Sequence, residues 1–484
     1  MQKEKKKIFT TILMSFLFIL LLSINGTTSK AATPEASIGT KNYTRLEDAV
    51  KKVKNGQTIT LKKNVKLKDT IAINRNVKFT LDLNKKTLNY SGEEVGILLR
   101  RKVNITIKNG TFKSTDGTIL NIGCQASVAI SGGIYRGDIY NTGNLTVKGG
   151  KIRDVVNNYG KLTIKGGTFE NTKGGDNLIY NGYNGNIAIS GGKFVNHASD
   201  AAGLYIYEGK LTIKGGTFST TGDSLIRNSY DGKVTILNGT FSSSNGLIFY
   251  DTGKTLTIKG GKFTTTSKEW PVLWSSQKVT ISGGTFTQKQ VNPILVSKGT
   301  LVVSGGTFKP YENCGIIGVA GLDTEIVLKK VTFRNVEVLG GWYVDMSTVN
   351  LTIDGAKIYA DTDIDVFGYV QKLVMKDGLI SQKNRLKTYT LIMNGGTINI
   401  ENDGIGEDYS YSSIEVQMNG GKIYCKNNTA VNRVKKFVQT GGTIQTDAKE
   451  TYAVTVSKNW GEKVTIKRTG GKIVSKTAGF EIDK

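Results

Sequence analysis

A short motif recurs seventeen times between Ile105 and Ile473, and it consists of an apolar strand, a glycine-rich corner and a bulky apolar residue. One copy reads Leu162-Thr-Ile-Lys-Gly-Gly-Thr-Phe169. The second corner position of the copies falls at Gly110, Gly133, Gly150, Gly167, Gly192, Gly216, Gly239, Gly261, Gly284, Gly306, Val331, Ala356, Gly378, Gly396, Gly421, Gly442 and Gly471. Copies about 22 residues apart, built from β-favouring runs and turn residues, predict a solenoid whose coil holds two or three short strands.

Within one copy, Leu162 and Ile164 point into the coil, whereas Thr163 and Lys165 point outward, because side chains alternate along a strand. Gly167 permits the sharp corner that follows. Stacked coils lie about 4.8 Å apart, so equivalent residues form ladders. The predicted ladder after the corner contains Phe112, Phe169, Phe194, Phe218, Phe241, Phe263, Phe286, Phe308 and Phe333, then Ile358, Ile380, Ile398, Ile423, Ile444 and Ile473. The switch from Phe to Ile predicts a changed coil cross-section and not a new domain.

The segment before the repeats differs from them. Thr44-Arg-Leu-Glu47 has the form of a capping box, and Leu46, Ala49, Val50 and Val53 lie on one face of the short helix that it would open. Asn55-Gly56 would end this helix, and strands are expected at 58–61, 71–73 and 79–83. We expect the helix to close the N-terminal end of the solenoid, where the first coil would otherwise expose its interior.

Residues 1–31 read as a secretory signal, because four lysines precede an apolar stretch from Ile8 to Ile24 and small residues follow at Ser29 and Ala31. The domain boundaries are therefore 1–31 for the signal peptide, 32–104 for the N-terminal cap and first coils, and 105–484 for the repeats. Once the signal is cleaved, we expect no transmembrane anchor. The three cysteines lie too far apart for a disulfide framework and are expected to be buried, and a secreted chain without disulfides fits a Gram-positive bacterium.

The chain is strongly basic. It carries a net charge of +26, and residues 1–31 contain five lysines and one glutamate, so +22 remains after cleavage. Such a charge favours polyanionic partners, and we expect an anionic polysaccharide or cell-wall polymer and not nucleic acid. Lysines recur at two repeat positions, two residues before and one residue after the second corner position, and Lys165, Lys214 and Lys259 are the candidate ligand-binding members. The alternative is that these lysines keep exposed strands soluble and block edge pairing.

Several segments carry a family resemblance. The opening helix, the run Asn55-Gly-Gln-Thr-Ile-Thr-Leu61, the segment Thr80-Leu-Asp-Leu-Asn84 and the Gly-Gly-Thr-Phe repeats together resemble the pectate-lyase-like superfamily, especially its bacterial secreted and surface members. The resemblance covers residues 40 to 480 and implies an all-β, right-handed parallel β-helix solenoid of about 17 coils with an N-terminal capping helix. That superfamily includes lyases, glycoside hydrolases, esterases, adhesins and passive surface repeats, so the resemblance alone does not select a function.

The enzyme classes can be narrowed by residue type. His197 is the only histidine, so the Gly-His-Gly segment of polygalacturonase-like enzymes is absent, and pectin-esterase-like motifs are missing too. Lyase chemistry on a uronate polymer needs no histidine, because Ca²⁺ can neutralise the uronate carboxylate while Lys or Arg removes the α-proton. Asp361, Asp363 and Asp365 are the candidate Ca²⁺ ligands, and an acidic loop at 401–408 is a second cluster. Solvated acidic loops are the alternative interpretation of both.

Aromatic residues provide the other candidate contacts. Trp270, Trp274 and Trp342 could stack on sugar rings, or they could fill irregular coil corners. Tyr180, Tyr183, Tyr205 and Tyr207 could line the same groove or fill the core. The sequence therefore favours a secreted, surface-associated, non-catalytic adhesin-like module for an anionic polysaccharide, without a cofactor. A Ca²⁺-dependent polysaccharide lyase acting on a uronate polymer is the rival hypothesis, and a passive spacer is the third.

Overall fold

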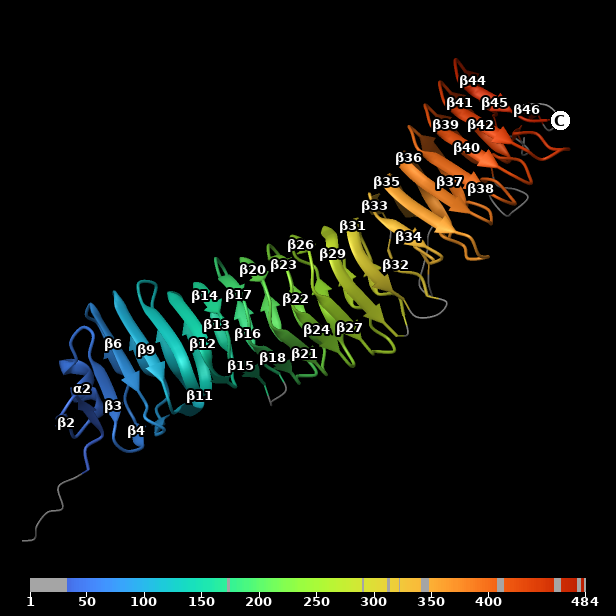
Figure 1. The fold of residues 1–484 in the computed structure, drawn as a ribbon. Coiled ribbons are helices and arrows are strands. Elements are labelled where there is room, and N and C mark those ends of the chain that lie inside the picture. Colours follow the sequence, from blue (N-terminus) through green and yellow to red (C-terminus); the bar gives the residue numbers. More distant parts are fainter. Residues whose placement is uncertain are drawn as a thin grey trace, which may run out of the picture.

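The computed structural model describes residues 33–171, 175–289, 291–310, 314–321, 323–340, 348–406, 413–456, 463–476 and 480–482. Its strands stack along one axis into a long rod, with the first and last coils at opposite ends (Figure 1). Successive strands of each ladder pair in parallel, so the predicted parallel β-solenoid is confirmed. The predicted signal peptide lies outside the described residues. Among the described helices, none has the length and apolar character needed to cross a membrane.

The single described helix lies at the N-terminal end, beside an antiparallel pair of strands (Figure 1). Helix α2 (Leu46–Lys52) packs with strands β1 (Ala36–Ile38), β2 (Lys41–Tyr43) and β3 (Thr58–Leu61). Strand β1 pairs antiparallel with both β2 and β3. Leu46, Ala49, Val50 and Val53 of the predicted apolar face are buried in the same hydrophobic core as the coils.

The predicted capping box is wrong. The N-cap of α2 is Arg45, which makes no side-chain capping bond, and the Leu46 amide instead donates to Glu35 Oε2 at 2.9 Å. Glu47 forms an ion pair with Arg45 at 3.2 Å. The helix also ends at Lys52, before the predicted Asn55-Gly56 stop. A residue outside the motif, Glu35, supplies the cap, which explains why a local pattern assigned it incorrectly.

A distant arginine stabilises the other end of α2. The Arg75 Nη2 donates to Val50 O at 2.8 Å and to Val53 O at 2.6 Å. These carbonyls lie at the C-terminal end of the helix, where the last groups have no partner within the helix and a cation is favoured. Arg75 thereby ties the helix to the second coil.

The coils form three parallel sheets, which we number in chain order. Sheet 1 contains β3, β6 (Val77–Asp82), β9 (Val103–Lys108), β14 (Lys161–Ile164), β17 (Asn186–Ile189), β20 (Lys210–Ile213), β23 (Lys233–Ile236), β26 (Thr255–Ile258), β33 (Thr324–Lys329), β37 (Thr388–Met393), β39 (Ile414–Met418), β41 (Val434–Gln439) and β44 (Thr465–Arg468). Sheet 2 contains β4 (Val65–Leu67), β7 (Thr87–Tyr90), β15 (Thr168–Glu170), β18 (Lys193–Asn196), β21 (Thr217–Thr220), β24 (Thr240–Ser243), β27 (Lys262–Thr265), β34 (Thr332–Arg334), β38 (Thr397–Ile400), β40 (Lys422–Cys425), β42 (Thr443–Thr446) and β45 (Lys472–Val474).

Sheet 3 contains β5 (Ile71–Ile73), β8 (Val95–Leu99), β13 (Val156–Asn158), β16 (Ile179–Asn181), β19 (Leu204–Ile206), β22 (Ser224–Asn228), β25 (Leu247–Asp251), β28 (Leu273–Ser275), β30 (Ile294–Val296), β32 (Ile317–Val319), β43 (Val454–Val456) and β46 (Phe480–Ile482). Long strands bend around corners and serve more than one sheet, namely β10 (Thr111–Ile122), β11 (Ser127–Asn141), β12 (Asn144–Ile152), β29 (Val279–Gln288), β31 (Gly299–Lys309), β35 (Val349–Ala360) and β36 (Val370–Gln382).

The predicted phenylalanine ladder is present inside sheet 2. From Phe169 to Phe308 the rings stack in successive coils, with centroids 4.5–5.0 Å apart and interplanar angles of 6–20°. Phe333 continues the ladder at 6.1 Å but is tilted by 40°. Phe112 is separated from Phe169 by Tyr135 and Ile152 in the register of the strands. From Phe194 to Phe286 each ring therefore buries both of its faces against neighbouring rings, which makes the ladder the main aromatic core.

The corner glycines behave as predicted at most positions. Gly167 has a φ of 99°, and a Cβ there would approach Gly150 O to 3.0 Å. At three corners the left-handed residue lies one position earlier, at Asn109 (φ 59°), Lys330 (φ 48°) and Gly355 (φ 76°). The second corner residue at two of these is Val331 or Ala356, whose Cβ disfavours a left-handed backbone.

The solenoid changes its cross-section after β32. Between β32 and β43, sheet 3 continues as single bridges, from Ile317 to Leu339, from Leu339 to Phe367, and from Leu386 through Ile405 and Val431 to Val454. Strand β43 then pairs in parallel with β46. Sheets 1 and 2 keep parallel pairing through β33, β35 and β36, so the same ladders run on. This agrees with the change of coil shape predicted from the Phe-to-Ile switch.

Buried amide ladders hold the corner between sheets 3 and 1. The Asn141 Nδ2 donates to Asn158 Oδ1, and the Asn158 Nδ2 donates to Asn181 Oδ1, both at 2.7 Å. The Asn181 Nδ2 in turn donates to the carbonyls of Gly185 at 3.0 Å and Glu208 at 2.8 Å. These bonds tie the turns of successive coils to the interior, so the outer surface of this corner has a rigid support.

The cysteines are free and differ in exposure. Cys425 is buried as predicted, Cys314 is half-buried and Cys124 is exposed. The expectation of burial is therefore wrong for Cys124, which lies in the turn after β10, between two sheets. The separation of the three residues in the coil order excludes pairing among them, as predicted.

Candidate functional site

The outward face of sheet 3 carries aromatic side chains in successive coils. Each short strand has one central residue that points outward between two buried ones, as in Ile179-Tyr180-Asn181. Register pairs Tyr180 with Tyr205, Tyr205 with Arg227, Arg227 with Tyr250, and Tyr250 with Trp274. We call these five residues the sheet-3 stack. The structure thus answers which way Tyr180, Tyr205 and Trp274 point, a question that the sequence left open.

An arginine completes this stack. The Arg227 guanidinium carbon lies 6.0 Å from the Tyr205 ring centroid and 5.2 Å from that of Tyr250. Tyr250 and Trp274 stack with centroids 4.8 Å apart and an interplanar angle of 7°. Cation–π contact lets Arg227 replace an aromatic ring without interrupting the column. Because Tyr250 and Trp274 face each other along the axis, this pair presents its edges to solvent.

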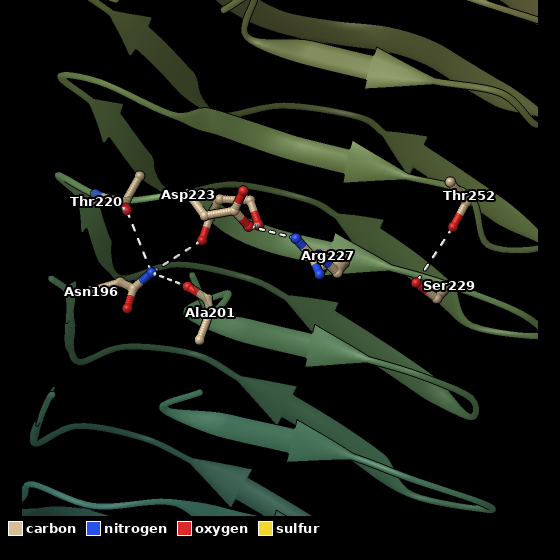
Figure 2. A network of polar contacts seen from close by, with 9 residues as sticks. Asn196, Ala201, Thr220, Asp223, Arg227, Ser229 and Thr252 are labelled. Carbon is tan, nitrogen blue, oxygen red and sulfur yellow. Dashed lines mark hydrogen bonds and ion pairs between the residues drawn. The ribbon is translucent and has the colours of Figure 1, made fainter. Parts of the chain in front are cut away.

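Asp223 fixes the position of Arg227. Its Oδ2 accepts from Arg227 Nη2 at 2.6 Å and from Ser224 Oγ at 2.9 Å. Figure 2 shows this pair beside the Asn196 amide, which donates to Ala201 O at 2.9 Å in the turn between sheets 2 and 3. Asp223 therefore neutralises the charge of Arg227 locally. Arg227 contributes mainly to the sheet-3 stack and little to the long-range electrostatic attraction of polyanions.

A second aromatic cluster lies at the turns that join sheet 3 to sheet 1. Tyr183 and Tyr230 are 57% and 67% exposed, the two highest values among large apolar or aromatic side chains in the described residues. Tyr207 lies between them, with ring centroids 5.8 Å from Tyr183 and 4.4 Å from Tyr230. Tyr159 is connected to the cluster through Tyr180, whose ring centroid lies 6.0 Å from that of Tyr159 and 6.3 Å from that of Tyr207. We call Tyr159, Tyr183, Tyr207 and Tyr230 the tyrosine edge.

Local geometry presents these rings to solvent. Tyr230 has a φ of 46°, which is unusual for a bulky residue, and Asn184 next to Tyr183 has a φ of 61°. The Gly232 amide donates to Ser229 O at 2.9 Å and closes the turn around Tyr230. In the next coil the Thr252 hydroxyl donates to Ser229 Oγ at 3.4 Å (Figure 2). Hydrogen bonding to Tyr230 and to Tyr183 raises the pKa of the Tyr207 hydroxyl above its ordinary value.

A row of lysines runs beside the tyrosine edge. Lys161, Lys210 and Lys233 begin their strands in sheet 1 two or three residues after Tyr159, Tyr207 and Tyr230. They are exposed and share one ladder position, with Asn186 between Lys161 and Lys210. Over the described part of the chain, these three lysines make no ion pair. Two carboxylates also lie at this edge, Glu208 and Asp231, and Asp231 pairs with Lys254 at 3.5 Å.

The predicted lysine stripe is less regular than its spacing suggested. Lys165, Lys214 and Lys259 are exposed on sheet 1, as expected. Ser190 lies between the first two in the ladder and Leu237 between the last two, so lysine occurs only in every second coil there. The row at Lys161, Lys210 and Lys233 was not among the candidate residues predicted from the sequence. The sequence contains a pattern that could have identified this row, since each of these lysines directly precedes the apolar pair of its repeat.

The three predicted tryptophans fall in different places. Trp274 is part of the sheet-3 stack, and Trp270 is 46% exposed in the turn that precedes β28. The Trp270 carbonyl accepts from Gln288 Nε2 at 2.7 Å. Trp342 lies outside the described residues. Trp274 is thus the tryptophan that the structure brings together with other aromatic candidates.

The predicted calcium ligands lie in the turn after β35. Asp363 pairs with Lys383 at 2.8 Å, and Asp365 pairs with Lys387 at 3.4 Å. Asp361 lines a shallow cavity of about 250 Å³, together with Lys383, Glu401, Tyr424 and Lys426. No group of three or more His, Cys, Asp or Glu suited to a metal ion occurs among the residues that the structure describes. Calcium binding at Asp361, Asp363 and Asp365 stays a prediction, and a cation there would have to displace the paired lysines.

Comparison of the chain with known proteins gave no match to any family model, to any curated protein or to any solved structure.

Proposed function

We propose that this protein is a secreted, surface-associated and non-catalytic binding module for an anionic polysaccharide, and that the tyrosine edge with its lysine row is the contact surface. One observation carries the proposal: the two most exposed tyrosines among the described residues, Tyr183 and Tyr230, lie on turns beside the ladder position of Lys210 and Lys233. The interior Asn181 amide supports the turns of Tyr183 and Tyr207. Ring faces can pack on the apolar faces of sugars, and the ammonium groups can attract carboxylate or sulfate.

The cellular context is part of the same proposal. The Lys-rich and apolar pattern of residues 1–31 supports export, and the scarcity of cysteines supports a Gram-positive source. Membership of the pectate-lyase-like superfamily is proposed from the sequence segments quoted above, and the parallel solenoid is compatible with it. The net charge of +26 supports an anionic cell-wall polymer or a similar polysaccharide as partner.

The lyase hypothesis is kept as a second candidate because of one feature. Asp361 and Glu401, which come from the two predicted acidic clusters, line the same cavity as Lys383 and Lys426. A cation held by the carboxylates and a lysine acting as base could serve proton abstraction from a uronate. Absorbance at the unsaturated-uronate band, followed with pectate and alginate in the presence of Ca²⁺, tests this candidate. A rise abolished by chelator would replace the binding proposal with the lyase.

Binding is tested with the mature protein and a panel of pectate, alginate and sulfated glycosaminoglycans. We expect the double variant Tyr183→Ser/Tyr230→Ser and the double variant Lys210→Gln/Lys233→Gln each to weaken binding by about tenfold, since each removes two contacts. The control is Lys193→Gln/Lys262→Gln, which removes the same charge from exposed positions of sheet 2. Equal losses in the control and the edge variants would refute the assigned surface.

A further inference from the structure

We infer that the bound polyanion lies along the solenoid axis, on a continuous track that runs from a basic turn near the N-terminal end to the tyrosine edge. This inference rests on the proposed function and adds the direction, the length and the two-part chemistry of the site. Its first support is that the track follows one structural feature, the turn between sheets 3 and 1, through successive coils.

The N-terminal part of the track is purely cationic. Arg100, Arg101 and Lys102 form the exposed turn between β8 and β9. Lys78 in the preceding coil and Lys54 in the first coil are also exposed at this corner, and the Lys78 carbonyl accepts from the Gly56 amide at 2.8 Å. Among the described residues, none of these five makes an ion pair. The turn therefore carries uncompensated positive charge and no aromatic ring.

The turns between the two parts are stacked and carry no acidic residue. The Gly123 amide donates to Leu99 O at 2.9 Å, the Thr142 amide to Ile122 O at 2.8 Å, and the Tyr159 amide to Asn141 O at 2.7 Å. Neither the turn at 123–126 nor the turn at 142–144 contains a charged residue. A polyanion that leaves Arg101 along the axis thus meets no repulsive group before it reaches Lys161.

The register sets the length of the track. Asn104, at the end of the basic turn, is aligned with Ser127, Asn144, Lys161, Asn186, Lys210 and Lys233 in turn. Six coil steps of about 4.8 Å place Lys233 about 29 Å from the basic turn. Only a polymer that spans this distance can contact Arg100–Lys102 together with Tyr230, the member of the tyrosine edge that lies farthest from the basic turn.

The two parts should contribute differently to affinity. Aromatic contacts at the tyrosine edge are short-ranged and tolerate salt, whereas attraction to the cationic turn is screened over about 10 Å at moderate ionic strength. When a long polysaccharide binds at the tyrosine edge, the rest of its anionic groups are held close to the cationic turn. Their effective concentration at that turn is therefore high. Affinity should therefore rise with chain length, and the added affinity should be more sensitive to salt than the affinity for the tyrosine edge alone.

The experiment uses the mature full chain, with oligogalacturonates and heparin-derived oligosaccharides of defined lengths as probes. We expect Kd to fall by at least tenfold between chains shorter than half the track and chains longer than it, with a plateau beyond that length. The variant Arg100→Gln/Lys102→Gln should remove this gain and leave binding of short chains within twofold. The variant Tyr183→Ser/Tyr230→Ser should weaken short and long chains alike, and Lys193→Gln/Lys262→Gln should change neither.

The possible outcomes distinguish failure of the axial track from failure of the proposed binding function. Binding that does not depend on chain length, or an equal loss of short and long chains in Arg100→Gln/Lys102→Gln, would overturn the track and leave the tyrosine edge as the binding site. Absence of binding by every probe at low salt would overturn both. Circular dichroism of each variant, compared with the unchanged protein, identifies any variant that fails to fold, and the single Lys102→Gln change then replaces the double one.

Discussion

Asp251 is a buried carboxyl whose charge should make the solenoid less stable as the pH rises. It is fully enclosed behind Tyr250, and its Oδ1 and Oδ2 accept from Asn228 Nδ2 at 2.7 Å and Ser275 Oγ at 2.8 Å. Burial raises the pKa of Asp251 from 3.8 to about 6, and the two hydrogen bonds offset only part of this effect. The folded protein therefore binds the proton of this group more tightly than the unfolded chain does.

The sign and size of the effect follow from linkage. The stabilisation that protonated Asp251 provides is fully present below pH 3.8 and is lost as the pH rises through about 6. The difference between these two pKa values corresponds to about 3 kcal/mol of unfolding free energy. Asp251→Asn removes the titration and keeps an amide that can join the Asn228 ladder. At pH 8 the variant should be more stable than the unchanged protein by up to about 3 kcal/mol, and at pH 4 it should show no advantage.

Guanidinium-induced unfolding at pH 4, 5, 6, 7 and 8 measures this difference, with far-ultraviolet circular dichroism as the probe. The control is Asp231→Asn, which removes the same charge from a carboxylate that is 72% exposed. The control should leave the pH dependence of the unfolding midpoint unchanged. A difference between Asp251→Asn and the unchanged protein that stays constant across the pH range would refute the assignment of the raised pKa to Asp251.

Three further predictions concern the ladders and the first coil. Phe218→Ala should lower the unfolding free energy by about 3–5 kcal/mol in denaturant titrations, because the buried ring stacks on Phe194 and Phe241 at 4.5 and 4.7 Å; a loss below 1 kcal/mol would contradict the packing. Gly167→Ala should destabilise the protein by more than about 1 kcal/mol in the same titration, whereas Gly149→Ala, where φ is not positive and the nearest atom lies 3.5 Å away, should cost less. Arg75→Met should reduce amide hydrogen-exchange protection in α2 by about tenfold, since two carbonyls at the helix end lose their donor, and unchanged protection would show that the helix does not need this cap.

The core ladders could be predicted from sequence because each of them depends on one short motif. Leu162, Ile164 and Phe169 follow the alternation of a strand and the position of a corner, and those two rules place them inside wherever the motif recurs. The end of a helix is a different case. The cap of α2 comes from Glu35 and Arg75, which lie 11 and 25 residues from the helix groups Leu46 and Val50 that they bind. No local pattern contains that information.

The candidate site was only partly visible in the sequence for a related reason. Sheet 3 has strands of three to five residues that no glycine motif marks, and the connections that lead to it vary in length. The outward direction of Tyr180, Tyr205 and Trp274 is decided by which neighbours are buried, and this follows only once the coils are aligned. Lys161, Lys210 and Lys233 also occupy one repeat position, but only the structure shows that this position lies beside exposed tyrosines, whereas Lys165, Lys214 and Lys259 stand directly before the glycines of the motif.

Because equivalent residues are aligned from coil to coil, the length of the solenoid depends on the number of coils. Ile213 pairs with Ile189 on one side and Ile236 on the other, so excision of residues 214–236 would join Ile213 to Leu237 and let Ile213 take the place of its equivalent, Ile236. Each coil contacts mainly its two neighbours, so such a change alters length without altering the local packing rules. Gain or loss of whole coils can therefore lengthen or shorten the reach of this protein in steps of about 4.8 Å. Duplication or deletion of a coil is therefore enough to change the length of the solenoid, and the hydrophobic core needs no new packing arrangement.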